Sequence, residues 1–213
     1  MAINLKKGQT INLEKDQFDL SNVTIGLGWD VMKKEKGFWS TLFSNEEDED
    51  YDLDAIAFLL DENGKVANVG NQRLEGGDIV FFNNLHHFSG NIYHTGDNRT
   101  GDGDGDDEQL IVKLDKMGSE YSKIVFVVSI YQGIQKKQNF GQVENAFIRA
   151  VDARGKEILR YDLSHDASFD GKCSMIFGEL YRYNGNWKFR AVGTPYATDS
   201  FVDILRDNYF VNS

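Results

Sequence analysis

The chain has 213 residues and carries 23 Lys and Arg against 34 Asp and Glu, which gives a formal net charge of −11 at pH 7. That balance argues against nucleic acid, and against an anionic membrane surface as the main partner, because both need clustered Lys and Arg. It makes divalent cations the natural counter-ions to consider, while a hydrophobic content of 40% is ample for a folded core.

Cysteine content and hydropathy indicate the compartment. The single Cys173 excludes an internal disulfide framework and a zinc site with two or more Cys ligands. The N-terminus lacks the apolar run of a signal peptide, and no segment approaches the ~20 apolar residues of a membrane-spanning helix. We therefore expect a cytoplasmic protein that is not an integral membrane protein.

Most of the chain is typical of short strands separated by turns. In chain order, strand-length runs occur at 23–27, 55–60, 79–82, 110–114, 124–130, 158–161 and 175–181, with a further run at 65–67 after a turn. Residues 143–151 fit either a strand or one helical turn. Asn184-Gly185 between alternating aromatic runs predicts a type I′ hairpin that pairs the 175–181 run with 187–192.

One helix is expected at the C-terminus. Asp199 or Ser200 would cap it, and Phe201, Ile204, Leu205 and Phe210 follow near helical spacing. Because long amphipathic crossover helices are missing, the pattern favours an all-β fold, a β-sandwich of two antiparallel-rich sheets with short helices. No clear linker divides the chain, so we expect a single domain over 1–213 with an inserted loop at about 33–51.

The inserted loop combines basic, aromatic and acidic stretches in that order. It fits a solvated insertion, or a docking loop whose anchors would be Phe38, Trp39, Leu42 and Phe43. Both interpretations stay open at this point.

The segment Gly96–Glu108 carries the main chemical pattern, with six carboxylates and a glycine at almost every second position. Hard cations such as Ca²⁺ take six to eight oxygen ligands in flexible geometry. The loop fails the EF-hand pattern, since Asp107 stands where Gly belongs and Lys113 where the last Glu belongs. Such loops are also often solvated turns. Asp30, Asp52 and Asp54 lie at predicted strand ends, which converge at one end of a sandwich.

Catalytic motifs are scarce. The sequence has no Gly-x-Ser-x-Gly elbow, no His-Glu-x-x-His and no phosphate-binding loop. His86 and His87 fall in a polar turn that is usually at the surface, His94 precedes the acidic loop and is expected to be structural, and Cys173 is expected to be a buried thiol. No catalytic residue is assigned.

A set of motifs then resembles the TerD family of tellurium-resistance and general-stress proteins. The matching segments, from Leu5 to about Tyr196, are Ile25–Asp30, Asp52–Ala55, His94–Gly101, Asp106–Glu108, Gln138–Gln142, Asn145–Arg149, Arg160–Leu163 and Gly178–Arg182. The resemblance implies a calcium-binding β-sandwich without demonstrated enzymatic activity, linked to tellurite and other stress resistance. The inserted loop resembles the longer branch of that family.

The resemblance also implies the metal ligands. Carried over residue by residue, they are Asp30, Asp52, Asp54, Asp97, Asn98, Asp102, Asp104, Asp106, Asp107 and Glu108, with Thr100 and Gly101 as further oxygen donors. One or two Ca²⁺ ions are expected. At Asp102 and Asp104 this chain departs from shorter members, which usually have Glu.

Three functions follow as hypotheses. The first is a calcium-dependent binding and scaffold module of the stress response, with paralogous TerD-type proteins and membrane-associated stress proteins as partners. The second is a metal-assisted hydrolase with His94 as its base, or a tellurite reductase, which a single cysteine disfavours. The third is a simple calcium buffer.

Overall fold

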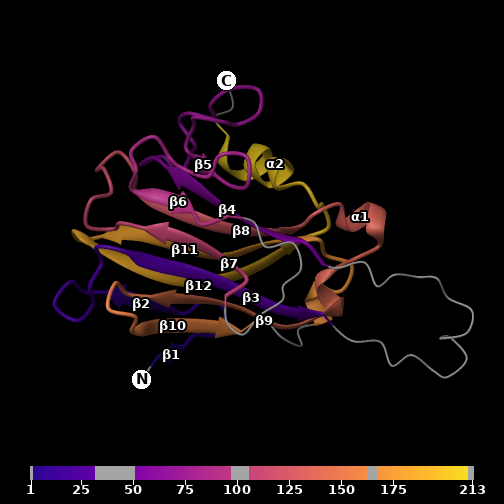
Figure 1. Ribbon diagram of the computed structural model, residues 1–213, viewed down its shortest axis with the longest axis horizontal. Helices are drawn as coiled ribbons and strands as arrows, with labels where there is room; N and C mark the ends of the chain where they lie inside the picture. The colour runs from indigo at the N-terminus through magenta and orange to yellow at the C-terminus, as the bar shows by residue number, and fades with distance from the viewer. Residues whose placement is uncertain (1, 32–50, 97–105, 163–166, 211–213) are drawn as a thin grey trace, which may run out of the picture.

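The structure is a computed structural model that describes residues 2–31, 51–96, 106–162 and 167–210. Its strands form two six-stranded sheets (Figure 1). In spatial order the first sheet holds β1 (Ile3–Asn4), β10 (Glu157–Asp162), β9 (Val143–Val151), β3 (Val23–Val31), β7 (Glu108–Val112) and β6 (Ile92–His94). The second holds β2 (Thr10–Leu13), β12 (Asn186–Tyr196), β11 (Ser174–Tyr183), β8 (Lys123–Ile130), β4 (Leu53–Leu60) and β5 (Ile79–Val80).

Every strand pairing is antiparallel except that of β1 with β10. Helical segments are short: α1 (Gly133–Lys136), α2 (Phe201–Ile204), the 3-10 turns η2 (Phe140–Gln142) and η3 (Ala167–Phe169), and the π-helical η4 (Leu205–Tyr209). The all-β sandwich with a C-terminal helix is thus confirmed. Within the described part of the chain, no helix has the length and apolar character needed to cross a membrane.

Side-chain alternation along β4 creates two apolar layers. Leu53, Ala55 and Leu59 point into the main core between the sheets, whereas Ile56 and Phe58 lie on the opposite face. That second face is covered by α2 and η4, whose Ile204 and Leu205 are buried there, and Figure 1 shows α2 beside β5. Being covered on both faces explains why β4 is apolar from Ala55 to Leu60.

The hairpin predicted at Asn184-Gly185 is confirmed. Both residues have positive φ, 50° and 77°, and Tyr183 pairs with Asn186 across the turn. Residues 143–151, for which a helical turn was the alternative, form β9 because Ala146, Ile148 and Ala150 alternate into the core.

Some of the strand predictions were wrong in extent. The run at 65–67 is not a strand, since the Val66 amide donates to the Tyr209 carbonyl at 2.9 Å in the C-terminal segment. The run at 79–82 is a strand only over β5, because Phe81 bridges back to Asn84 in a tight turn. The short strands β1, β2 and β6 were not predicted.

Candidate metal centre

Three chain segments meet at one end of the sandwich and bring predicted ligands toward each other. They are the end of β3, the start of β4 and the residues that lead into β7. The Asp107 amide donates to the Leu27 carbonyl at 2.7 Å, and Asp107 Oδ2 accepts the Trp29 amide at 2.9 Å. Asp107 therefore lies against the end of β3, beside Trp29, the residue that precedes Asp30 in the sequence.

Glu108 joins the two sheets at the same end. Its side chain lies on the same inward face of β7 as that of Leu110. Its carboxylate Oε2 accepts a hydrogen bond from the backbone amide of Ala55, near the start of β4. The side chain of Glu108 is only 1% exposed, and the same oxygen lies 3.3 Å from His94 Nε2. A buried carboxylate is costly unless it is hydrogen-bonded, and these donors offset that cost.

His94 is held in one tautomer by its neighbours. The Gly96 amide donates to Nδ1 at 3.0 Å, so Nδ1 is the acceptor nitrogen and Nε2 carries the hydrogen that faces Glu108. Both ring nitrogens are thus engaged by the protein in a ring whose side chain is 1% exposed. The expected structural role of His94 agrees with this geometry, and the arrangement disfavours His94 as the general base of a hydrolase.

Asp106 is directed elsewhere. Its carboxylate pairs with Arg149 Nε at 2.7 Å and accepts from Gln109 Nε2 at 3.2 Å, and it lies over Gly26 on the face of β3 turned away from the core. The hydrogen bond that Arg149 donates to Asp106 is the main cause that raises the pKa of Arg149. Although Asp106 adjoins Asp107 in sequence, the structure does not bring its carboxylate together with those of Asp107 and Glu108.

The remaining described candidates differ in their surroundings. Asp30 is exposed and accepts from Asn145 Nδ2 at 2.7 Å. The Asp52 carbonyl accepts the Tyr131 amide at 2.8 Å, which fixes the backbone at the entrance to β4. Asp54 is buried on the same face of β4 as Ile56, opposite to that of Leu53 and Ala55.

Half of the predicted ligand set and all of the predicted docking residues lie outside the described residues. These are Asp97, Asn98, Thr100, Gly101, Asp102 and Asp104, and the docking residues Phe38, Trp39, Leu42 and Phe43. Within the described ranges, no group of three or more His, Cys, Asp or Glu side chains is arranged to hold a metal ion. The donor chemistry, carboxylate oxygen on converging strand ends, suits a hard cation such as Ca²⁺.

Two features of this end were missed by the sequence reasoning. The pairing of His94 with Glu108 had a weak signal, because both residues flank the acidic loop, but no sequence pattern indicates that their side chains point toward each other. The Asp106–Arg149 pair spans 43 positions and had no local signal.

The chain matches the model of the TerD domain over residues 1–208. It is 54% identical over 212 residues to "Tellurium resistance protein TerX" of Serratia marcescens, covering 97% of this chain and 99% of that protein. It is 44% identical to "Stress response protein SCP2" of Bacillus subtilis (strain 168), covering 96% and 98%. The crystal structure of a homologue of telluride resistance protein (TerD) from Streptomyces coelicolor shares the fold at a TM-score of 0.61 and 19% identity, over 90% of this chain and 99% of that one. The chain therefore belongs to the TerD family, whose named members are tellurium-resistance and stress-response proteins.

Proposed function

We propose that this chain binds Ca²⁺ where β3, β4 and the approach to β7 converge, and that it acts as a calcium-dependent binding and scaffold module rather than as an enzyme. The observation that supports this most is the anchoring of Asp107 and Glu108. Their carboxylates accept the backbone amides of Trp29 on β3 and Ala55 on β4, so two acidic residues lie against separate strands of opposite sheets.

Calcium would complete this arrangement through charge. Acidic residues that share one end of a protein with a net charge of −11 repel one another, and a bound divalent cation relieves that repulsion. Oxygens of the glycine-rich segment 97–105 would join those of Asp30, Asp52, Asp107 and Glu108 in holding one or two ions. Because ligands in an unfolded chain are not gathered together, binding also stabilises the folded state.

The test is a calorimetric titration of the chelator-stripped protein with Ca²⁺, with Mg²⁺ as competitor. We expect saturable binding at one or two sites that Glu108→Gln weakens. Glu62→Gln is the matched control, because Glu62 is an exposed glutamate in the turn that follows β4, at the end of that strand remote from Ala55. Absence of saturable binding at millimolar Ca²⁺ would contradict the proposal.

A scaffold module and a simple calcium buffer differ in how their structure responds to Ca²⁺. A scaffold module exposes or rearranges a surface when it binds its ion, whereas a buffer has no need to do so. We expect Ca²⁺ to change the binding of an apolar fluorescent dye and to alter the affinity for a purified paralogous TerD-type protein. Calcium binding without either change would leave the buffer as the function.

A further inference from the structure

A second polar cluster lies away from the candidate metal centre, between β5 and β6. It is built on a turn in which the Gly90 amide donates to the His87 carbonyl at 2.9 Å, and the His87 amide donates to Ile92 at 3.1 Å. Contrary to the expectation of a surface residue, His87 is buried, at 2% exposure. Its ring packs edge-on against Tyr121, with centroids 5.4 Å apart, and lies tilted by 38° against Phe88, with centroids 4.2 Å apart.

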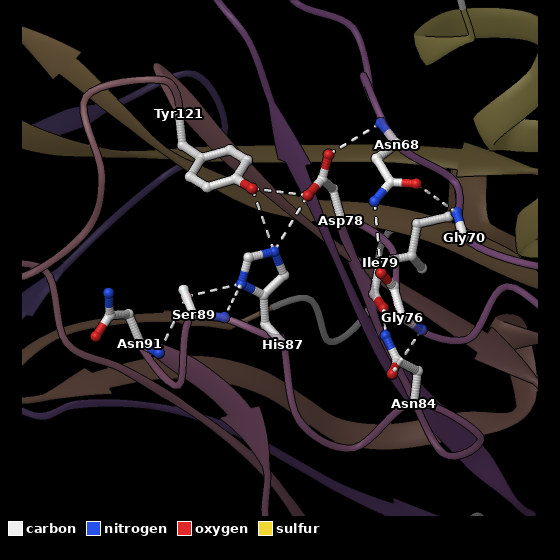
Figure 2. Close-up of polar contacts among 10 residues, drawn as sticks. All are labelled: Asn68, Gly70, Gly76, Asp78, Ile79, Asn84, His87, Ser89, Asn91 and Tyr121. Carbon is white, nitrogen blue, oxygen red and sulfur yellow. Dashed lines mark hydrogen bonds and ion pairs between the residues drawn. The ribbon is translucent and has the colours of Figure 1, made fainter.

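The inner side of the His87 ring faces a carboxylate. Nε2 lies 3.1 Å from Asp78 Oδ1, which also accepts the Tyr121 hydroxyl at 2.7 Å, while Asp78 Oδ2 accepts the Asn68 amide at 3.0 Å (Figure 2). Burial alone would raise the pKa of Asp78, but these hydrogen bonds outweigh it and the pKa is lowered. An ionised carboxylate only accepts, so Nε2 carries the imidazole hydrogen and Nδ1 is the basic nitrogen.

The outer side of the ring faces a hydroxyl. His87 Nδ1 lies 2.7 Å from Ser89 Oγ, and the Ser89 amide is 3.3 Å from the same nitrogen. Ser89 Oγ also accepts the Asn91 amide at 3.2 Å. Figure 2 shows Ser89, His87 and Asp78 in a line from the turn to the interior. Unlike the two groups behind it, Ser89 is exposed, so an external molecule can reach its hydroxyl.

A hydroxyl, an imidazole and a buried carboxylate in sequence form the arrangement that activates a serine. The imidazole takes the hydroxyl proton as the oxygen attacks, and the carboxylate stabilises the imidazolium that results. Here the serine meets Nδ1 and the aspartate meets Nε2, which preserves those roles with the two nitrogens exchanged. The Asn91 amide donates to Ser89 Oγ and holds the hydroxyl in place beside Nδ1.

We propose that Ser89 is a nucleophilic acyl-acceptor site, which takes the acyl group of an activated acyl ester such as a thioester or acyl phosphate. Ser89 Oγ forms the new bond to the carbonyl carbon, and its proton moves to His87 Nδ1. The bond from that carbon to the leaving group breaks, and the leaving group departs with the bonding electrons and receives the proton from Nδ1. Atoms and electrons balance without a further reactant.

The surface around Ser89 suits such a donor. The neighbouring Phe88 has 67% of its surface exposed and offers an apolar contact for an acyl chain. Lys113 Nζ donates to the Gly90 carbonyl at 3.0 Å and places a positive charge beside the turn, which favours an anionic leaving group. The proposal is independent of calcium binding, since none of its residues belongs to the candidate metal centre.

The test exposes the full-length protein to p-nitrophenyl acetate, follows release of p-nitrophenolate and locates the acetyl group by peptide mass spectrometry. We expect acetylation of Ser89 to exceed that of Ser21 by about 100-fold, the scale of general-base assistance. Ser21 is the matched control, because its hydroxyl donates at 2.7 Å to the carboxylate of Asp19 rather than to an imidazole. Ser89→Ala changes an exposed side chain and should abolish the release of p-nitrophenolate that accompanies acetylation of Ser89, without unfolding the protein.

His87→Gln identifies the base. It leaves the Ser89 hydroxyl in place and should reduce its acetylation to the level of Ser21. Equal labelling of Ser89 and Ser21 in the wild-type protein would overturn the proposal without any variant. Unchanged labelling of Ser89 in folded His87→Gln would overturn it as well.

Discussion

Gly26 and Asp106 show how a single residue is dictated by a neighbour far along the chain. A Cβ on Gly26 would come within 2.1 Å of Asp106 Oδ2, and that carboxylate is fixed by its ion pair with Arg149. Glycine therefore stands in the middle of β3, despite its entropic cost there, because the carboxylate lies directly on the backbone.

We expect Gly26→Ala to lower the free energy of unfolding by about 1–3 kcal/mol, the usual cost of forcing extra atoms into a packed position. The measurement is urea unfolding of Gly26→Ala, Asp106→Ala and the double variant. Because Asp106→Ala vacates the space, the double variant should lose less stability than the sum of the single variants. Strict additivity would mean that the two residues do not compete for this space.

Asp152 carries a residue-level dependence on pH. Burial alone would raise its pKa, but the amides of Lys156 and Asp19 and the side chain of Arg154 donate to it and lower the pKa to about 2. Since the pKa is lower in the folded state than its ordinary value of 3.8, the ionised carboxylate favours folding above that value. The contribution is lost as the pH falls from about 4 toward 2.

The variant Asp152→Asn should accordingly flatten the dependence of stability on pH between about 4 and 2, and lower stability at neutral pH by about 1–3 kcal/mol through lost charged hydrogen bonds. Urea unfolding at pH 7 and at pH 3 measures both effects. Asp207→Asn is the control, because among the described residues Asp207 forms its ion pair with the exposed Arg206 alone. A loss at pH 3 as large as that at pH 7 would contradict the assignment.

Among the elements, the C-terminal segment of α2 and η4 has the clearest structural role. It covers the face of β4 and β5 that points away from the main core, where Phe58 packs near Phe201 and Tyr209, with centroids 6.3 Å and 5.8 Å apart. Without this cover, the apolar side chains of that face would be in water.

We expect Ile204→Ala to destabilise the protein by about 2–5 kcal/mol, since Ile204 is 1% exposed and its truncation leaves a cavity. Val202→Ala, on the same helix but 42% exposed, should change stability by less than about 0.5 kcal/mol. Chemical denaturation of both variants makes the comparison. Similar losses would mean that helix propensity, rather than burial, determines the contribution of α2.

The strands and turns differ in how far the sequence alone predicts them. Strands with strong alternation or continuous apolar character, such as β8 and β11, and the Asn184-Gly185 turn were predictable because their signals are local. The strands β1 and β6 were not, because two or three residues carry no period and acquire their conformation from β10 and β7. At the candidate metal centre, whose ligands stay a prediction, the acidic residues can be picked out from the sequence. The direction in which the side chains of Asp106 and Asp54 point cannot, because it depends on which neighbours they meet in the fold.

At the scale of the whole molecule, the net charge of −11 and the convergence of strand ends lead to one expectation. If Ca²⁺ binds only the folded state, it stabilises that state by about 2.7 kcal/mol at a hundredfold excess over Kd, and more at higher excess. The unfolding midpoint of the chelator-stripped protein should rise with Ca²⁺ concentration. Simple screening of repulsion would give the same rise with NaCl of equal ionic strength, so that titration is the control.

Glu108→Gln separates a specific site from general screening. The amide keeps the shape of the side chain but removes the charge between His94 and Ala55, so the rise of the midpoint with Ca²⁺ should shrink while its response to NaCl persists. Glu62→Gln removes the same charge at an exposed position and should leave the calcium response intact. If both variants respond to Ca²⁺ alike, the stabilisation belongs to the overall charge of the molecule and not to this end of the sandwich.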